Sequence, residues 1–395
     1  LAGERWGGLV PASALEAARA GVPEGVTPRA RYEYAFRAQR RLLDEAYGAL
    51  RARAGGGEGG AVGASLEALG AFRQAEAEWL APAAVYEALC HEHGQIDWRR
   101  WPAGPGLPPD PRLYAPRPGE ARACASRLAE LEARRGADLE RFAFGQLVAR
   151  EQHARLRAEL GGLGLKLFGD LQVGYSIRDV WAYRSLFLRD YAMGAPPSRT
   201  NPEGQPWNYP VLDPALYFEP DGAPGPVVRF ARRRMLAMLR DYDGVRLDHP
   251  HGLVCPWVYR ADAPDPLAAV QGGARLFESP DEPDHPELAA YAIARPDQVD
   301  RSVARYADDR VSGLDEAQAA RYAALFDVVL EAAAARGRSK GDVLCEVLST
   351  QPHPLGRVRE RHGLGRFRIT QKANVDDARD VYRSENAAPE DWVMA

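Results

Sequence analysis

Short apolar runs in the second part of the chain constrain its fold more than any other feature. Polar or charged residues follow each run, and helical patterns such as 315–337 separate the later ones. Short apolar runs that alternate with helices are typical of buried parallel strands in an α/β fold. The expected strands lie at 163–174, 244–249, 342–349, 365–372 and 391–395.

Acidic residues stand at the ends of three of these runs, at Asp170, Asp248 and Glu346. In a (β/α)8 barrel the chemistry lies at the carboxyl ends of the strands, so this pattern favours a (β/α)8 TIM barrel. A doubly wound sheet is the competing topology. It has less support because no glycine-rich phosphate loop follows any of the expected strands. Since about five of the eight barrel strands can be found, we expect an incomplete barrel.

The first part of the chain has a mostly helical pattern instead. Apolar residues recur at helical spacing over 31–54 and again over 65–94, where Pro82 is expected to break the helix. We therefore expect a helical N-terminal or insertion region over residues 1–160 and the catalytic barrel portion over residues 161–395.

Composition excludes several classes of partner. The chain has 51 Lys and Arg against 55 Asp and Glu, a formal net charge of −4, which gives no support for nucleic-acid binding. It contains no apolar run long enough to predict a membrane span. Its cysteines are scattered without a Cys-x-x-Cys pair, which argues against a disulfide framework and favours a reducing, cytoplasmic location. They are Cys90, Cys124, Cys255 and Cys345.

Asp248 and Glu346 form the most informative pair of side chains. In a barrel both would face one mouth, and two carboxyl groups at one cleft are what glycoside cleavage requires. Arg246 lies two residues before Asp248, on the same face of the strand, where it would keep the carboxylate ionised and oriented. The alternative for each acid is an ordinary ion pair at the end of a strand.

A metal site is the competing interpretation of the same stretch. His249 and His251 have the His-x-His spacing of some metal-dependent hydrolases, and zinc would need further ligands. His285 and His353 are available, but neither follows a clear strand, and the prolines on both sides of His353 favour an exposed turn. We therefore expect no metal at this position.

The proline-rich segment 194–214 contains Trp207 and is expected to be a long irregular loop. One interpretation is a lid that offers an aromatic platform to the face of a sugar. The alternative is a packed surface loop with a buried tryptophan.

Five motifs, in order along the chain, resemble those of one family and together cover roughly residues 30–395. The chain is similar to the 4-alpha-glucanotransferases (amylomaltases) of glycoside hydrolase family 77, relatives of the α-amylase clan, whose fold is a (β/α)8 barrel with helical insertions. The motifs are "WLAPAAVYEALCHEHGQIDWRRWP" (79–102), "FGDLQVGYSIRDVWAYRSLF" (168–187), "GAPPSRTNPEGQPWNYPVLD" (194–213), "VRLDHPHG" (245–252) and "CEVLS" (345–349).

The resemblance implies a transferase that moves α-1,4-glucan segments to acceptor sugars by a retaining double displacement. Asp248 would be the nucleophile, Glu346 the general acid/base, and Arg246 would orient Asp248. In such an enzyme the two carboxyl groups are expected to lie about 5–5.5 Å apart. The implied partners are maltooligosaccharides and α-1,4-glucans, with no metal or organic cofactor.

The resemblance also implies substrate-binding residues. Asp170 would lie at the base of the donor-side pocket, and Trp207 would line the acceptor side. His249 and Gln205 would be further contacts to sugar. His251 has no implied role, since the family's usual residue at that position differs.

The motifs depart from the family pattern at five positions. Gln172 replaces a proline, Ser198 an aspartate and Asn208 a glycine, while Val347 and Ser349 replace an aspartate and a glycine beside Glu346. These changes bear on acceptor preference and loop behaviour more than on the reaction class.

The family's third carboxylate, in a His-Asp pair, would follow just after Ala395. We therefore expect these residues to be a fragment of a longer protein, whose gene continues with that pair. Two alternative functions remain open, namely an α-glucan hydrolase of the same clan and a non-catalytic glucan-binding fragment.

Overall fold

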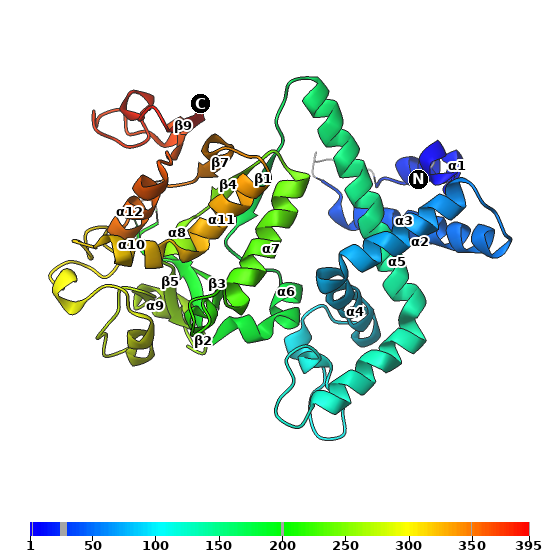
Figure 1. Ribbon diagram of the computed structural model, residues 1–395, viewed down its shortest axis with the longest axis horizontal. Coiled ribbons are helices and arrows are strands. Elements are labelled where there is room, and N and C mark those ends of the chain that lie inside the picture. Colours follow the sequence, from blue (N-terminus) through cyan, green and yellow to red (C-terminus); the bar gives the residue numbers. More distant parts are fainter. Residues whose placement is uncertain (2, 24–29, 199–200, 349, 395) are drawn as a thin grey trace. The chain divides into compact units, whose positions relative to one another are not determined.

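The computed structural model describes residues 1–395 except 2, 24–29, 199–200, 349 and 395 (Figure 1). Its contacts divide the chain into two compact units. The helical unit comprises Leu1–Leu156 and Ile177–Arg184, and the strand unit comprises Arg157–Ser176 and Ser185–Ala395. Within the described part of the chain, no helix combines the length and apolar character needed to cross a bilayer.

The helical unit forms because amphipathic helices bury their apolar faces in shared cores. Leu50 and Leu69 from two neighbouring helices pack in one cluster with Phe144, and all three are buried. The helix expected at 31–54 is confirmed as α2. The helices that begin in this unit are α1 (Ala12–Ala20), α2 (Tyr32–Gly55), α3 (Ala61–Ala75), α4 (Ala77–His93), α5 (Ala121–Gly162) and α6 (Ile177–Ala182).

The helix break expected at Pro82 is wrong. Pro82 lies inside α4, and the chain instead leaves helical geometry at Glu76, between α3 and α4. A proline inside a helix leaves the carbonyl four residues earlier without its usual N–H donor. Here that carbonyl belongs to Glu78, and the hydroxyl of Tyr183 donates to it at 3.2 Å. A tertiary hydrogen bond therefore replaces the missing helical one.

Asp110 organises the loop between α4 and α5. Its carboxylate is fully buried and accepts hydrogen bonds from Arg127 Nε at 2.9 Å and Nη2 at 3.1 Å. His93 Nε2 lies 2.9 Å from the same carboxylate, and the Trp181 indole donates to the Asp110 carbonyl at 2.9 Å. This buried ion pair holds α4, α5 and α6 to one loop.

The strand unit contains a parallel sheet with the order β1-β4-β7, made of β1 (Phe168–Gln172), β4 (Gly244–Asp248) and β7 (Val343–Cys345). All three strands were expected. Val245 and Leu247 are buried, whereas Arg246 and Asp248 are half-buried on the opposite face, as the alternation of a strand requires. In the described residues this sheet is open rather than closed into a barrel.

Long helices precede two strands of this sheet. α7 precedes β4 and α11 precedes β7, and these two helices pack against each other (Figure 1). The helices of the strand unit are α7 (Pro226–Asp241), α8 (His251–Val254), α9 (Pro266–Gln271), α10 (Glu316–Tyr322), α11 (Ala324–Ala335) and α12 (His353–His362).

A second, antiparallel sheet was not expected from the sequence. Its order is β3-β2-β5-β6, with β2 (Phe187–Ala195), β3 (Gln205–Leu212), β5 (Trp257–Arg260) and β6 (Ala274–Arg275). The expectation of an irregular loop over 194–214 is therefore wrong for 194–195 and 205–212, which belong to the two strands of the β2–β3 hairpin. Its prolines are tolerated because β3 is an edge strand and its pairing with β2 is interrupted by register shifts.

The last two expected strands pair with each other. β8 (Phe367–Ile369) and β9 (Trp392–Met394) form a small parallel ladder. Arg368 reinforces it with a 2.6 Å ion pair to Asp391, which comes immediately before β9.

We predict that Arg127→Met lowers the free energy of unfolding by about 3–5 kcal/mol, because it leaves the buried Asp110 carboxylate without its main partner. The measurement is urea denaturation followed by circular dichroism. Arg134→Met is the matched control, since the Arg134 side chain is 64 % exposed against 6 % for Arg127. Its ion pair should contribute less than about 1 kcal/mol. Equal effects of the two substitutions would contradict the assigned role of Asp110.

Candidate active site

The carboxyl ends of β1, β4 and β7 bring four of the expected site residues together. Asp170 on β1 is in register with Arg246 on β4, and Asp248 ends β4. Glu346 follows β7 directly, and its N–H donates to the Leu247 carbonyl at 3.0 Å. The parallel register thus carries three acids from distant parts of the sequence to one edge of the sheet.

The Arg246 guanidinium lies among these three acids. Its Nη1 donates to Asp170 Oδ1 at 2.7 Å, and its Nη2 lies 2.7 Å from Glu346 Oε1 and 3.5 Å from Asp248 Oδ1. The expectation placed Arg246 beside Asp248, but its shorter contacts are to the other two acids. Arg246 therefore places its positive charge beside all three carboxyl groups.

Glu346 is the acid whose protonation is most strongly changed. Burial and a hydrogen bond to Asp248 raise the pKa of Glu346 to about 7, although the positive charge of Arg246 opposes them. A hydrogen bond between two carboxyl groups requires a proton on one of them, and burial assigns that proton to Glu346.

Solvent reaches the three acids unequally. The side chain of Glu346 is 12 % exposed, that of Asp248 35 % and that of Asp170 55 %. A protonated, buried acid beside a more accessible carboxylate is the arrangement in which one group donates a proton and the other attacks.

Trp207 and Gln205 lie on β3 of the β2–β3 hairpin, and Trp207 contacts His249, the residue after Asp248. The Trp207 indole donates to Gln205 Oε1 at 2.9 Å, and its ring packs edge-on against His249 with centroids 4.8 Å apart. The next residue, Asn208, has a φ of +56°, which explains why a glycine can stand there in the family motif. Tyr259 fixes this turn, because its hydroxyl donates to Asn208 Oδ1 and accepts from its N–H, both at 3.0 Å.

The two histidines after β4 stack on each other, with ring centroids 4.3 Å apart. His249 has a φ of +57°, so the chain turns sharply as it leaves Asp248. Burial lowers the pKa of His251 to about 4, and its Nε2 lies 3.0 Å from the Thr350 carbonyl. Both rings are therefore neutral near pH 7.

The other ligands considered for a metal lie in different surroundings. His285 contacts the Gly272 carbonyl at 2.9 Å and the Tyr191 hydroxyl at 3.3 Å. The exposed turn expected at His353 is wrong, since this residue begins α12 and Pro354 occupies an early helical position where a missing N–H is tolerated. Across the described ranges, no group of three or more His, Cys, Asp or Glu side chains is placed to hold a metal ion.

Two further residues of this region were not anticipated. Phe367 on β8 lies under the Arg246 guanidinium, with 5.8 Å from its ring centroid to Cζ. Asp308 accepts the N–H of Gln351 at 2.7 Å, and its carbonyl accepts that of His353 at 3.0 Å. The strand pattern around Phe367 was visible in the sequence, whereas nothing local distinguishes Asp308.

The departures from the family motif have different structural settings. Gln172 is in register with Asp248, and Val347 is buried beside Glu346. Ser198 forms an isolated bridge with Asn201 in the hairpin connection. Ser349 lies outside the described residues, as does part of the segment 194–214.

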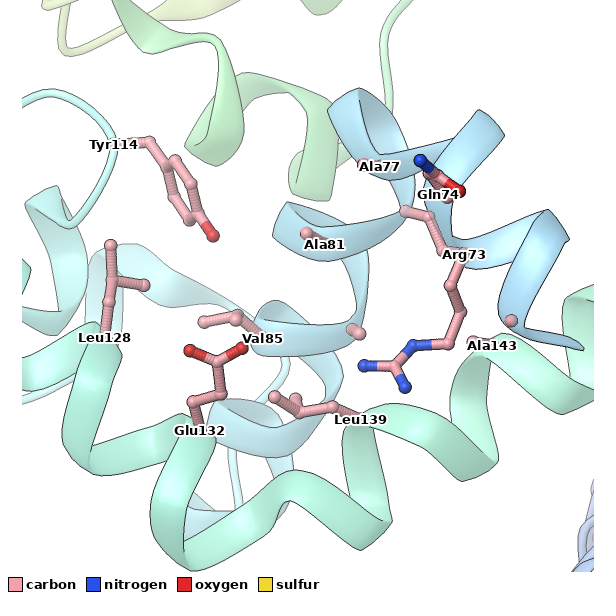
Figure 2. A pocket seen from close by; sticks show the side chains of 13 residues that line it. Arg73, Gln74, Ala77, Ala81, Val85, Tyr114, Leu128, Glu132, Leu139 and Ala143 are labelled. Atoms are coloured by element: carbon pink, nitrogen blue, oxygen red, sulfur yellow. The ribbon is translucent and has the colours of Figure 1, made fainter.

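The helical unit contains a cavity of its own, of about 470 Å³. Its floor is apolar, and Figure 2 shows the Tyr114 hydroxyl and the Glu132 carboxylate turned toward it. None of the expected site residues is among the residues that line it. The carboxylate cluster thus remains the candidate active site.

Comparison with known proteins identifies the class to which this fold and site belong. The sequence model described as 4-alpha-glucanotransferase matches residues 10–395, so the chain belongs to the 4-alpha-glucanotransferase family, glycoside hydrolase family 77. The 4-alpha-glucanotransferase of Thermus thermophilus is 31% identical over 226 residues, which are 54% of this chain and 40% of that protein. The chloroplastic/amyloplastic enzyme of Oryza sativa subsp. japonica is 28% identical over 193 residues, or 47% of this chain and 29% of its own length. The chain thus spans less than half of these relatives.

Solved structures support the fold. An amylomaltase from Streptococcus agalactiae in complex with acarbose superposes with a TM-score of 0.67 and 16% identity, over 98% of this chain and 64% of that one. The amylomaltase from Corynebacterium glutamicum gives a TM-score of 0.53 and 18% identity, over 91% and 38%. The expectation of an amylomaltase fold, present as an incomplete barrel, is confirmed.

We predict that Arg246→Met raises the pKa of Glu346 above about 7, because it removes the positive charge that favours the ionised carboxylate. Carbon-13 NMR titration of the Glu346 carboxyl measures this directly. Arg232→Met is the control, since Arg232 pairs with Glu331 on the α7–α11 surface. A Glu346 midpoint that is unchanged in Arg246→Met would show that Arg246 does not act on Glu346.

Proposed function

We propose that this protein is a retaining 4-alpha-glucanotransferase in which Asp248 is the nucleophile and Glu346 the general acid/base. The observation that carries the proposal is the raised pKa of Glu346, about 7, beside the more accessible Asp248 carboxylate. A general acid must hold its proton at the operating pH, and a nucleophile must not. Membership of the 4-alpha-glucanotransferase family supports the same assignment.

In the first step, an α-1,4-glucan places its anomeric carbon between the two carboxyls, which breaks their hydrogen bond. An Asp248 oxygen attacks this carbon while Glu346 delivers its proton to the leaving glycosidic oxygen. The bond to the leaving sugar breaks and a glycosyl ester of Asp248 forms. Arg246 faces the carboxylate that Glu346 then becomes, at the 2.7 Å contact described above.

In the second step, the Glu346 carboxylate takes the proton of an acceptor's 4-hydroxyl group. The acceptor oxygen displaces Asp248, which restores the original configuration at the anomeric carbon and regenerates the protonated Glu346. A bound sugar reacts in preference to water because it is held in place. Trp207, supported by Gln205 and His249, offers the aromatic face for that acceptor.

The substrates we propose are maltodextrins, that is, maltooligosaccharides and α-1,4-glucans, acted on in the cytoplasm. The amylomaltase from Streptococcus agalactiae that shares this fold was solved with acarbose. Three of the four cysteines are buried and all four are free thiols, which fits a reducing compartment. Asp170 would contact the donor sugar, since it is the most exposed of the three acids.

Product analysis separates this function from its alternatives. With maltotriose as the only substrate, a transferase should form longer oligosaccharides together with glucose, as seen by chromatography. A hydrolase should release glucose and maltose without longer products. Maltotriose that is bound but unchanged would identify a glucan-binding protein instead.

Replacing the acid tests the assigned chemistry. We predict that Glu346→Gln lowers the transfer rate by about 10²–10⁴-fold, because the amide cannot deliver or accept the proton. Glu331→Gln, on the α11 surface, is the matched control and should keep the wild-type rate. A Glu346→Gln variant of normal activity would remove this residue from the mechanism.

The pH dependence follows from the same group. Glu346 acts in its protonated form, so kcat/KM should fall as pH rises through the pKa of about 7. Steady-state rates between pH 5 and 9, chosen as the test range around that pKa, measure this fall, which is the basic limb of the pH profile. A limb above pH 9 would mean that another group supplies the proton.

A further inference from the structure

Among the described residues, the polar contacts of the His251 side chain are to Thr350, just beyond Glu346. Its Nε2 lies 3.0 Å from the Thr350 carbonyl oxygen and 3.5 Å from the Thr350 hydroxyl. A carbonyl oxygen can only accept, so Nε2 carries the hydrogen and donates it. The Nδ1 atom is then a bare acceptor, and it is buried with no hydrogen-bond partner among the described residues.

This contact holds the chain that follows Glu346, the proposed acid/base, between two other anchoring hydrogen bonds. At its start, the Glu346 N–H donates to the Leu247 carbonyl at 3.0 Å. At its end, Asp308 accepts the N–H groups of Gln351 and His353. Between these anchors, the hydrogen bond from His251 to Thr350 ties the segment to the chain that follows the nucleophile. One imidazole therefore joins the chain just after Asp248 to the chain just after Glu346.

The ring of His251 is itself held in place by its surroundings. It is 6 % exposed and stacks on His249 at an interplanar angle of 27°. His249 in turn packs edge-on against Trp207 at 86°. A stacked, buried ring has little freedom to rotate, so its donor points in one fixed direction.

We propose that His251 is a positioning residue for Glu346: its Nε2–H group fixes the Thr350 carbonyl and so holds the Glu346 carboxyl against Arg246 and Asp248. The inference rests on the proposed function, because it concerns the acid/base of that reaction. It assigns a role to the histidine of the "DHPH" stretch that the family resemblance left without any.

The test compares three variants of the protein as its gene encodes it. His251→Phe keeps a ring that can stack on His249 but removes the donor. His251→Gln keeps a donor, because Gln Nε2 is as many bonds from the backbone as His Nε2, but removes the ring. His285→Phe is the matched control, since it removes a similar buried contact to a backbone carbonyl, that of Gly272.

We expect His251→Phe to lower kcat/KM on maltotriose by about 10–100-fold, the loss typical of a displaced catalytic group. Its basic limb should move to lower pH, since a Glu346 that is less firmly held in its buried position has a pKa nearer the ordinary value. The charges of Arg246 and Asp248, which act on the Glu346 carboxyl, are the same in this variant. His251→Gln should restore most of the rate and the wild-type limb, and His285→Phe should leave the limb in place.

The proposal would be overturned if the basic limb of His251→Phe lay at the same pH as that of the wild type. It would also be overturned if kcat/KM of His251→Gln were no higher than that of His251→Phe. Carbon-13 NMR titration of the Glu346 carboxyl gives a readout that does not depend on activity. If the wild-type protein transfers no glucan, the proposed function fails. The inference then stands or falls on whether His251→Phe lowers the pKa of Glu346 in that titration.

Discussion

The contact on which the rest of the site depends is that of one guanidinium with three carboxyl groups. Arg246 lies within 2.7 Å of both Asp170 and Glu346 and 3.5 Å from Asp248. A single positive charge cannot neutralise three negative ones in partly buried surroundings, so one acid retains its proton. The most buried of the three, Glu346, is the one that does. Parallel pairing is what makes this possible, because it places the ends of three distant strands side by side.

The unequal environments of these acids give each a distinct chemistry. Glu346 is enclosed and its pKa is raised to about 7, so it keeps its proton below that pH, whereas Asp248 and Asp170 are more open to solvent. The β2–β3 hairpin brings Trp207 to His249, and His251 connects that aromatic stack to the backbone beyond Glu346. The aromatic side of the site and its acid/base are thus parts of one packed arrangement.

Much of this could be predicted from the sequence, for identifiable reasons. β1, β4, β7, β8 and β9 were all expected, because each contains a short apolar run, and polar residues follow the first four. The β2–β3 hairpin was missed because its prolines indicate loop, and only the pairing of an edge strand with β2 makes them acceptable there. The helix break expected at Pro82 was wrong for a similar reason. The Tyr183 hydroxyl, which replaces the hydrogen bond that the proline removes, is about a hundred residues away in the chain.

The sequence by itself determined which residues are available: the carboxylates of Asp248 and Glu346, the nearby Arg246, and the motifs that assign the chain to its family. These are local patterns of residue type and spacing, and they survive without knowledge of the fold. Only the tertiary structure decided which acid holds the proton, and that Arg246 serves three carboxyls rather than one. It also decided that the His251 imidazole donates a hydrogen bond to the Thr350 carbonyl. Protonation and hydrogen bonding depend on burial and on partners that folding brings from elsewhere in the chain.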